Sequence, residues 1–272
     1  MIARGTLAVL ALACCTAGGA PVLAQEVDLT VLPPAQNGYQ PATTEWGEPD
    51  FRGGWPIDHL NGRTPLERDP VHGNRIFLTD EEFAEREAMV AELERRYENE
   101  DTQDKMGIGH WAEVAAANRR TSWIVSPSNG RLPAYTPEGK RLSDAMRSSW
   151  RQGQPFDWVT DFDSWDRCIT RGLPASMLPF MYNNGIRIFQ SPGLVAIQME
   201  MVHETRLIPT DGTASIPRQI QHWLGESRGR GENGNTLVVE TTNFKPGPSA
   251  TNIGTTGSPP ANDTPVSSEA KL

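Results

Sequence analysis

The fold of this chain is decided by one stretch, residues 182–206, which reads YNNGIRIFQSPGLVAIQMEMVHETR. Apolar and polar residues alternate on both sides of Pro192-Gly193, and a period of two is typical of strands with one apolar face. Pro192 and Gly193 suit the two central positions of a type II turn. The stretch therefore predicts a β-hairpin whose second strand runs from Leu194 to Arg206. Its register pairs Ile188 with Ile197, Ile186 with Met199, and Arg187 with Gln198.

Further along the chain, a second hairpin is predicted. Asn233-Gly234 favours a type I′ turn, and the alternating residues 236–244 that follow it form a strong strand. Earlier in the chain, Phe51 to Trp55 is read as a short entry strand. These segments predict a mainly β (α+β) fold built on an antiparallel β-sheet or barrel.

One long amphipathic helix is also expected. Thr79 and Glu82 form a capping box, and an apolar stripe along residues 80–98 predicts a helix that packs on a sheet, with Arg86 on its charged outer face. Residues 98–104 follow as an acidic loop. Shorter helices are predicted at 109–120 and from Thr136 to about residue 150.

The N-terminus has the pattern of a secretory signal. Residues 1–24 carry one charge, an apolar run and a small-residue cleavage site after Ala24. Export to the periplasm or secretion is the prediction, with a lipoprotein anchored through Cys14 or Cys15 as the alternative. Residues 25–78 are expected to be an extended, turn-rich leader, 79–244 a single β-rich domain, and 245–272 a disordered or truncated tail.

Composition limits the classes of partner. Without Arg4, which leaves with the signal, the chain has 24 basic against 34 acidic residues. This acidic balance argues against nucleic acid and anionic membranes as partners, and no segment after the signal is predicted to span a membrane. Cys168 is the only cysteine after the signal, so core burial rather than disulfides must stabilise the fold.

Several motifs resemble an uncharacterised family of exported bacterial proteins. They are Arg120-Thr121-Ser122 through Pro137-Glu138-Gly139, Arg167-Cys168-Ile169 with Tyr182-Asn183-Asn184, Glu200 to Arg206 with Leu207 to Gly212, and Trp223 to Gly229 through Thr236 to Phe244. The resemblance covers most of residues 120–244 and implies no established activity. The family tends to carry an aromatic where Gly231 stands, and its strands continue further. The resemblance therefore implies missing C-terminal strands, or a natural short member with a disordered tail.

Two motifs look catalytic but lack their structural context. Gly225-Glu226-Ser227-Arg228-Gly229 matches the pattern of a nucleophile elbow, which requires a helix directly afterwards, whereas a second strand is predicted here. His203-Glu204 resembles the start of a zinc motif, but leucine stands at position 207 in place of the second histidine. No metal and no cofactor is expected.

The candidate site lies around the central hairpin. His203 continues the Met199 and Met201 face, so it is either a hydrogen-bonded core histidine or a polar group at the end of a cavity. Met199 and Met201 would line that cavity, with Asn183 and Asn184 as further ligand-binding residues. Four residues are candidates for catalysis: His203, His222, Arg206 and Tyr182.

Three functions remain open at this point. The first is an exported protein that binds a small, partly apolar molecule in a β-walled cavity. The second is a cofactor-free acid/base enzyme, a lyase, isomerase or hydrolase, that uses His203 and His222. The third is an interaction module of the cell envelope.

Overall fold

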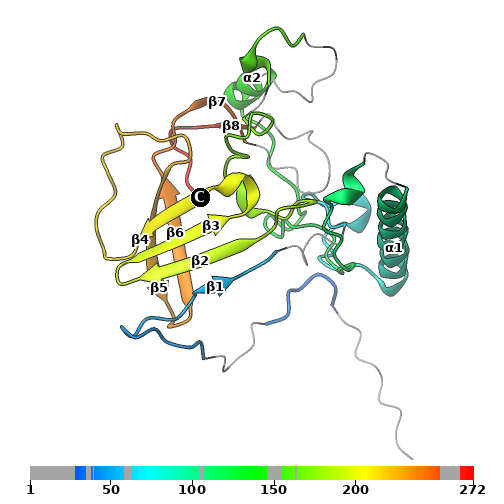
Figure 1. The fold of residues 1–272 in the computed structure, drawn as a ribbon, viewed down its shortest axis with the longest axis horizontal. Coiled ribbons are helices and arrows are strands. Elements are labelled where there is room, and N and C mark those ends of the chain that lie inside the picture. The colour runs from blue at the N-terminus through cyan, green and yellow to red at the C-terminus, as the bar shows by residue number, and fades with distance from the viewer. Residues whose placement is uncertain are drawn as a thin grey trace, which may run out of the picture.

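The computed structural model describes residues 28–34, 38, 40–57, 63–103, 107–145, 153, 155–162, 164–251 and 264–272. The predicted signal, residues 1–24, lies outside them. Two antiparallel sheets lie face to face at the centre (Figure 1). The four-stranded sheet has the order β1 (Gly53–Gly54), β2 (Ile186–Ser191), β3 (Leu194–Met199) and β4 (Thr205–Pro209). The mainly β (α+β) prediction is confirmed. Of its two alternatives, a sheet or a barrel, the structure has open sheets.

The central hairpin has the predicted register. Ile188 pairs with Ile197, Ile186 with Met199, and Arg187 with Gln198 across β2 and β3. Gly193 has a φ of +74°, which the second central position of a type II turn requires. Val195 and Ile197, which are predicted to share the apolar face, are both buried, together with Ile208 of β4.

The predicted second strand is wrong beyond Met199. β3 ends there, Met201–His203 forms a 3-10 turn, and β4 runs back along β3. The Met199 N–H donates to the Glu204 carbonyl at 2.8 Å, which closes a second hairpin. Val202 and His203 in this turn have φ values of +56° and +55°. A β-branched residue seldom adopts that conformation, so the sequence pattern gives no sign of the turn.

The second sheet packs on the inner face of the first. It consists of β5 (Glu226–Glu232) and β6 (Thr236–Thr242), and Leu237 and Val239 of β6 pack on the Val195, Ile197 and Ile208 cluster. Gly229 of β5 lies so close to β4 that a Cβ there would be 2.8 Å from Ile208 Cγ2. The predicted turn is present: Asn233 and Gly234 both have positive φ, as a type I′ turn needs.

The long helix α1 (Asp80–Thr102) begins at the predicted capping box. The Thr79 N–H donates to Glu82 Oε2 at 2.8 Å, and the Glu82 N–H donates to Thr79 Oγ1 at 3.3 Å. The helix continues past residue 98 into the predicted acidic loop. It does not pack on a sheet: it lies apart from both sheets (Figure 1) and contacts the 3-10 turn Ile108–His110.

Two details of the helix predictions are wrong. Arg86 does not face solvent: it is 8% exposed and donates to the Asn118 and Arg120 carbonyls at 2.9 and 2.5 Å. The predicted helix at 109–120 is absent beyond that 3-10 turn. α2 (Pro137–Ala145) begins where predicted, and its expected continuation at 146–150 lies outside the described residues.

The terminal segments contribute to the structure. β1, from the predicted leader, pairs with β2 and so confirms the short entry strand. Residues 245–272 were expected to lack regular structure, but β7 (Gly247–Thr251) pairs with β8 (Thr264–Val266). In the described ranges, no helix is long and apolar enough to cross a bilayer.

Candidate functional site

The predicted histidines both lie at the surface. His203 leaves the apolar face at the 3-10 turn and is exposed, with its Nδ1 3.3 Å from the Glu200 carbonyl oxygen. The core-histidine interpretation is therefore wrong, and so is its place on the Met199 and Met201 face. His222 is also exposed, on a separate segment whose backbone pairs with residues 243–245. No hydrogen bond joins the two histidines.

The two methionines belong to the core. Met199 is 1% exposed and Met201 is 3% exposed, so both are among the buried apolar residues of the protein. Burial of an apolar side chain of this size stabilises a fold by roughly 1.5–3 kcal/mol. Their main contribution is therefore to stability.

The Tyr182-Asn183-Asn184 motif is part of a loop held together by Glu113. The Asn183 N–H donates to Glu113 Oε1 at 2.8 Å, and Asn184 Nδ2 donates to Glu113 Oε2 at 2.7 Å. Asn184 is 3% exposed and also bonds both backbone polar groups of Phe180. Tyr182 packs edge-on against Phe180, and burial raises the pKa of its phenol. These contacts give the motif a structural role.

Arg206 lies between the two sheets. It is buried, and its Nη1 donates to Ser227 Oγ at 2.7 Å, while Nη2 donates to the Leu224 carbonyl at 3.1 Å. Ser227 in turn shares a 2.8 Å hydrogen bond with Thr241 Oγ1 on β6. Ser227 stands inside β5 with no helix after it, so it is a buried structural serine and the nucleophile elbow is excluded.

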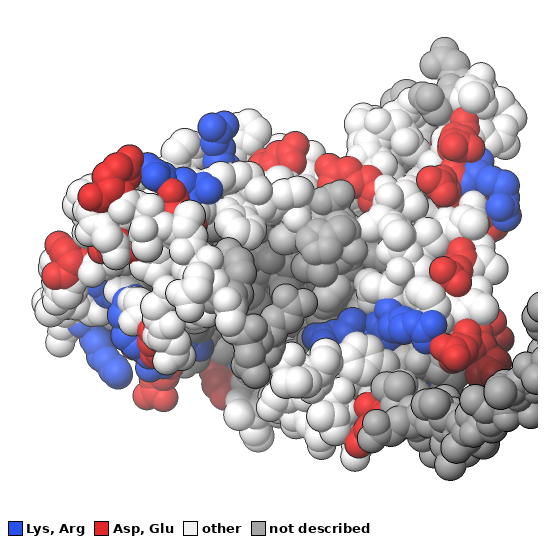
Figure 2. Space-filling model, turned by 90° about the horizontal axis from the view of Figure 1, so that it is seen from below, with Lys and Arg blue, Asp and Glu red and all other residues white. Residues whose placement is uncertain are grey.

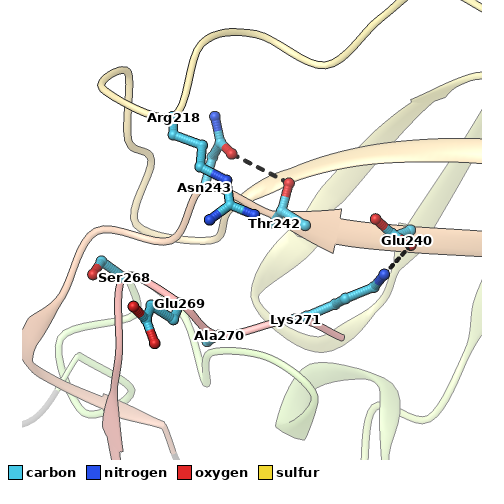
Figure 3. A pocket seen from close by; sticks show the side chains of 8 residues that line it. All are labelled: Arg218, Glu240, Thr242, Asn243, Ser268, Glu269, Ala270 and Lys271. Atoms are coloured by element: carbon cyan, nitrogen blue, oxygen red, sulfur yellow. Dashed lines mark hydrogen bonds and ion pairs between the residues drawn. The ribbon is translucent and has the colours of Figure 1, made fainter.

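A polar pocket lies elsewhere, beside the end of β6 (Figure 3). Its volume is about 110 Å³, which is small beside the ~300–1,000 Å³ of pockets for drug-sized ligands. Eight residues line it: Arg218, Glu240, Thr242, Asn243, Ser268, Glu269, Ala270 and Lys271. All but Ala270 are polar, so the lining suits a small polar molecule better than an apolar one.

Three segments far apart in the sequence form the pocket. The C-terminal segment, residues 267–272, lies along β6 because Thr241 and Leu272 exchange two backbone hydrogen bonds of 2.8 and 3.0 Å. The loop that carries Arg218 is held by Asn243, whose Nδ2 lies 3.1 Å from the Ile216, Pro217 and Ile220 carbonyl oxygens. Asn243 has a φ of +56°, a conformation that asparagine tolerates better than most residues.

Two of the four charged residues of the pocket form an ion pair with each other, and the other two do not. Lys271 Nζ pairs with Glu240 Oε2 at 2.5 Å, so these two neutralise each other. Within the part of the chain that the structure describes, neither the Arg218 guanidinium nor the Glu269 carboxylate has an ion-pair partner. In Figure 3 Arg218 approaches from the loop and Glu269 from the C-terminal segment. The pocket thus offers one cationic and one anionic group to a ligand.

The wider surface adds little to this local arrangement. Figure 2 shows acidic and basic side chains interspersed over one face, with uncharged areas between them. A surface on which positive and negative charges alternate has a weak net electrostatic field, so it does little to attract a charged ligand. Among the described residues, no cluster of three histidines, cysteines or carboxylates could hold a metal ion.

Sequence reasoning missed this pocket. Of its residues, the sequence marks only Glu240, Thr242 and Asn243, which fall in a predicted strand, and the other segments look like loop and tail. No family model, curated protein or solved structure matches this chain. The resemblance to exported bacterial proteins therefore stays a prediction.

Proposed function

We propose that this chain is an exported binding protein for a small zwitterionic molecule, held in the pocket between β6 and the C-terminal segment. One observation carries the proposal: Arg218 and Glu269 line the same pocket with no ion-pair partner among the described residues. A guanidinium binds carboxylate or phosphate groups through directed hydrogen bonds, and a carboxylate binds ammonium groups. Export rests on the N-terminal sequence pattern alone.

The proposed ligand differs from the partly apolar one that the sequence suggested. The apolar wall of Met199 and Met201 is buried in the core, whereas most of the residues that line the pocket are polar. A volume of about 110 Å³ suits a ligand of amino-acid size. No specific contact favours the acid/base enzyme, because His203 and His222 lie exposed on separate segments.

Calorimetric titration with a charge-matched series tests the proposal. The series is glycine, β-alanine and γ-aminobutyrate as zwitterions, with propionate and propylamine as singly charged controls. We expect the wild type to bind one or more zwitterions and to bind the singly charged compounds at least tenfold more weakly, because only a zwitterion engages both groups.

Two variants assign the binding to the pocket. Arg218→Gln should lose the zwitterion signal. Arg230→Gln should keep it, because Arg230 is an exposed arginine of the neighbouring strand β5 that pairs with Glu232. The proposal would be rejected if Arg218→Gln and Arg230→Gln gave equal heats of binding. It would also be rejected if the wild type gave no heat of binding with any zwitterion.

A further inference from the structure

A second polar centre, which shares no residue with the pocket, lies around the guanidinium of Arg68. This side chain is only 1% exposed. Its Nε donates to Thr121 Oγ1 at 2.9 Å, and its Nη1 donates to the Ser128 carbonyl at 2.5 Å. Gly130, with a φ of +66°, leaves room for it, since a Cβ there would lie 2.8 Å from Arg68 Cζ. The loops are thus built around a buried cation.

The charge of Arg68 is not compensated by the residues that it contacts. All its hydrogen-bond acceptors are neutral, and its buried Nη2 has no hydrogen-bond partner in the described part of the chain. Burial lowers the pKa of Arg68, and the nearby positive charge of Arg120 lowers it further. A buried charge without a counter-charge costs several kcal/mol, so such groups are normally paired.

Arg120 and Trp123 add two more unsatisfied donors on the facing segment. Arg120 precedes Thr121, the partner of Arg68, and its buried Nε has no hydrogen-bond partner among the described residues. The same holds for the indole Nε1 of Trp123. Backbone hydrogen bonds from Trp123 to Pro65 (3.0 Å) and from Ile124 to Leu66 (3.1 Å) tie this segment to the one that carries Arg68. All three groups are N–H donors that lack a hydrogen-bond acceptor within the described ranges.

We propose that the loops carrying Arg68 and Arg120 bind a small oxyanion, with the chemistry of phosphate, sulfate or a carboxylate. An oxyanion supplies both the missing negative charge and acceptors for several N–H groups at once. Arg86, which donates to the Arg120 carbonyl, adds a third cation nearby, with Glu82 as its acidic neighbour. The site is independent of the β6 pocket and of the function proposed for it.

Thermal unfolding in sodium sulfate and sodium phosphate tests this site. Sulfate also stabilises proteins by exclusion from their surface, but that effect grows steadily with concentration, whereas site binding saturates. We expect the wild type to gain about 2–4 °C in Tm along a saturating curve, relative to sodium chloride at equal ionic strength. Calorimetric titration with sulfate should give one site.

Adjacent arginines provide matched variants. Arg120→Gln should lose the saturating part of the curve and the calorimetric signal. Arg119→Gln should keep both, because Arg119 is exposed and already pairs with Asp80 at 2.7 Å. Arg68→Met should also lose the saturating part of the curve and the calorimetric signal. Because the Arg68→Met change can prevent folding, the test of the proposal rests on Arg120→Gln.

Three outcomes would overturn the proposal. The first is the same saturating curve in Arg120→Gln as in the wild type. The second is a curve lost in Arg218→Gln but kept in Arg120→Gln, which would place the anion in the β6 pocket. The third is a rise in Tm that is linear in salt concentration for the wild type and all variants, which would mean that no anion binds here.

Discussion

Arg206 and Glu204 form a buried ion pair at the start of β4, with Nη2 3.6 Å from Oε1 and less than a tenth of either side chain exposed. Glu204 Oε2 also accepts hydrogen bonds from Thr170 Oγ1 at 2.8 Å and Ser176 Oγ at 3.0 Å. Since Arg206 bonds Ser227 on β5, the pair links the loop at 170–176, the first sheet and the second sheet.

Arg206→Met should lower the free energy of unfolding by about 3–5 kcal/mol, because it leaves the Glu204 carboxylate buried without its counter-charge. Urea denaturation followed by circular dichroism measures this. Arg187→Met is the control, since Arg187 is an exposed arginine of the same sheet. A similar loss in both variants would show that the ion pair has no special role.

Gly229→Ala should destabilise the protein by about 1–3 kcal/mol, because the new Cβ would lie 2.8 Å from Ile208 Cγ2 and Thr210 Cγ2 and push β5 away from β4. Gly231→Ala on the same strand should have little effect, because no atom lies within 4 Å of its Cβ position. Equal midpoints of urea unfolding for the two variants would contradict this account of the sheet packing.

Glu82 should make α1 sensitive to acid. Arg75 bonds both carboxylate oxygens of Glu82, at 2.7 and 2.8 Å, and this contact does most to lower the pKa of Glu82 from 4.5 to about 2. The folded pKa is below the unfolded one, so the stabilisation is complete above about pH 4.5 and is lost as the pH falls towards 2. Glu82→Gln should therefore be less stable than the wild type at pH 6, and the difference should shrink at pH 3.

Urea titrations at both pH values measure that difference. Glu92→Gln is the control for the general loss of a helix carboxylate, because Glu92 lies on the exposed side of α1. A gap between wild type and Glu82→Gln that stayed constant down to pH 3 would contradict the lowered pKa.

Asn243→Ala should loosen the loop that carries Arg218. The two amide hydrogens of Asn243 are shared among the three carbonyl groups at 216, 217 and 220, and their loss leaves that loop without its main anchor. Trypsin should then cut after the exposed Arg218 roughly tenfold faster, since local opening costs less. Mass spectrometry of the fragments follows the cut. Asn235→Ala, in the β5–β6 turn, should leave this rate unchanged.

The sequence by itself determined the features that depend on near neighbours in the chain. The register of β2 and β3 follows from alternation around Pro192-Gly193, and the start of α1 follows from Thr79 and Glu82, three residues apart. The turn at Asn233-Gly234 likewise follows from two residues that tolerate positive φ. Each of these signals is complete within a few residues.

Only the tertiary structure decided where His203, Arg86 and the pocket lie. The turn after Met199 has no glycine, proline or asparagine. It is held instead by Glu200, whose N–H and carboxylate bond the backbone of Gly185 on the other side of the hairpin. Arg86 is buried because carbonyl groups some thirty residues away accept its hydrogen bonds. The pocket needs the C-terminal segment beside β6, and such contacts between distant segments leave no periodic mark in the sequence.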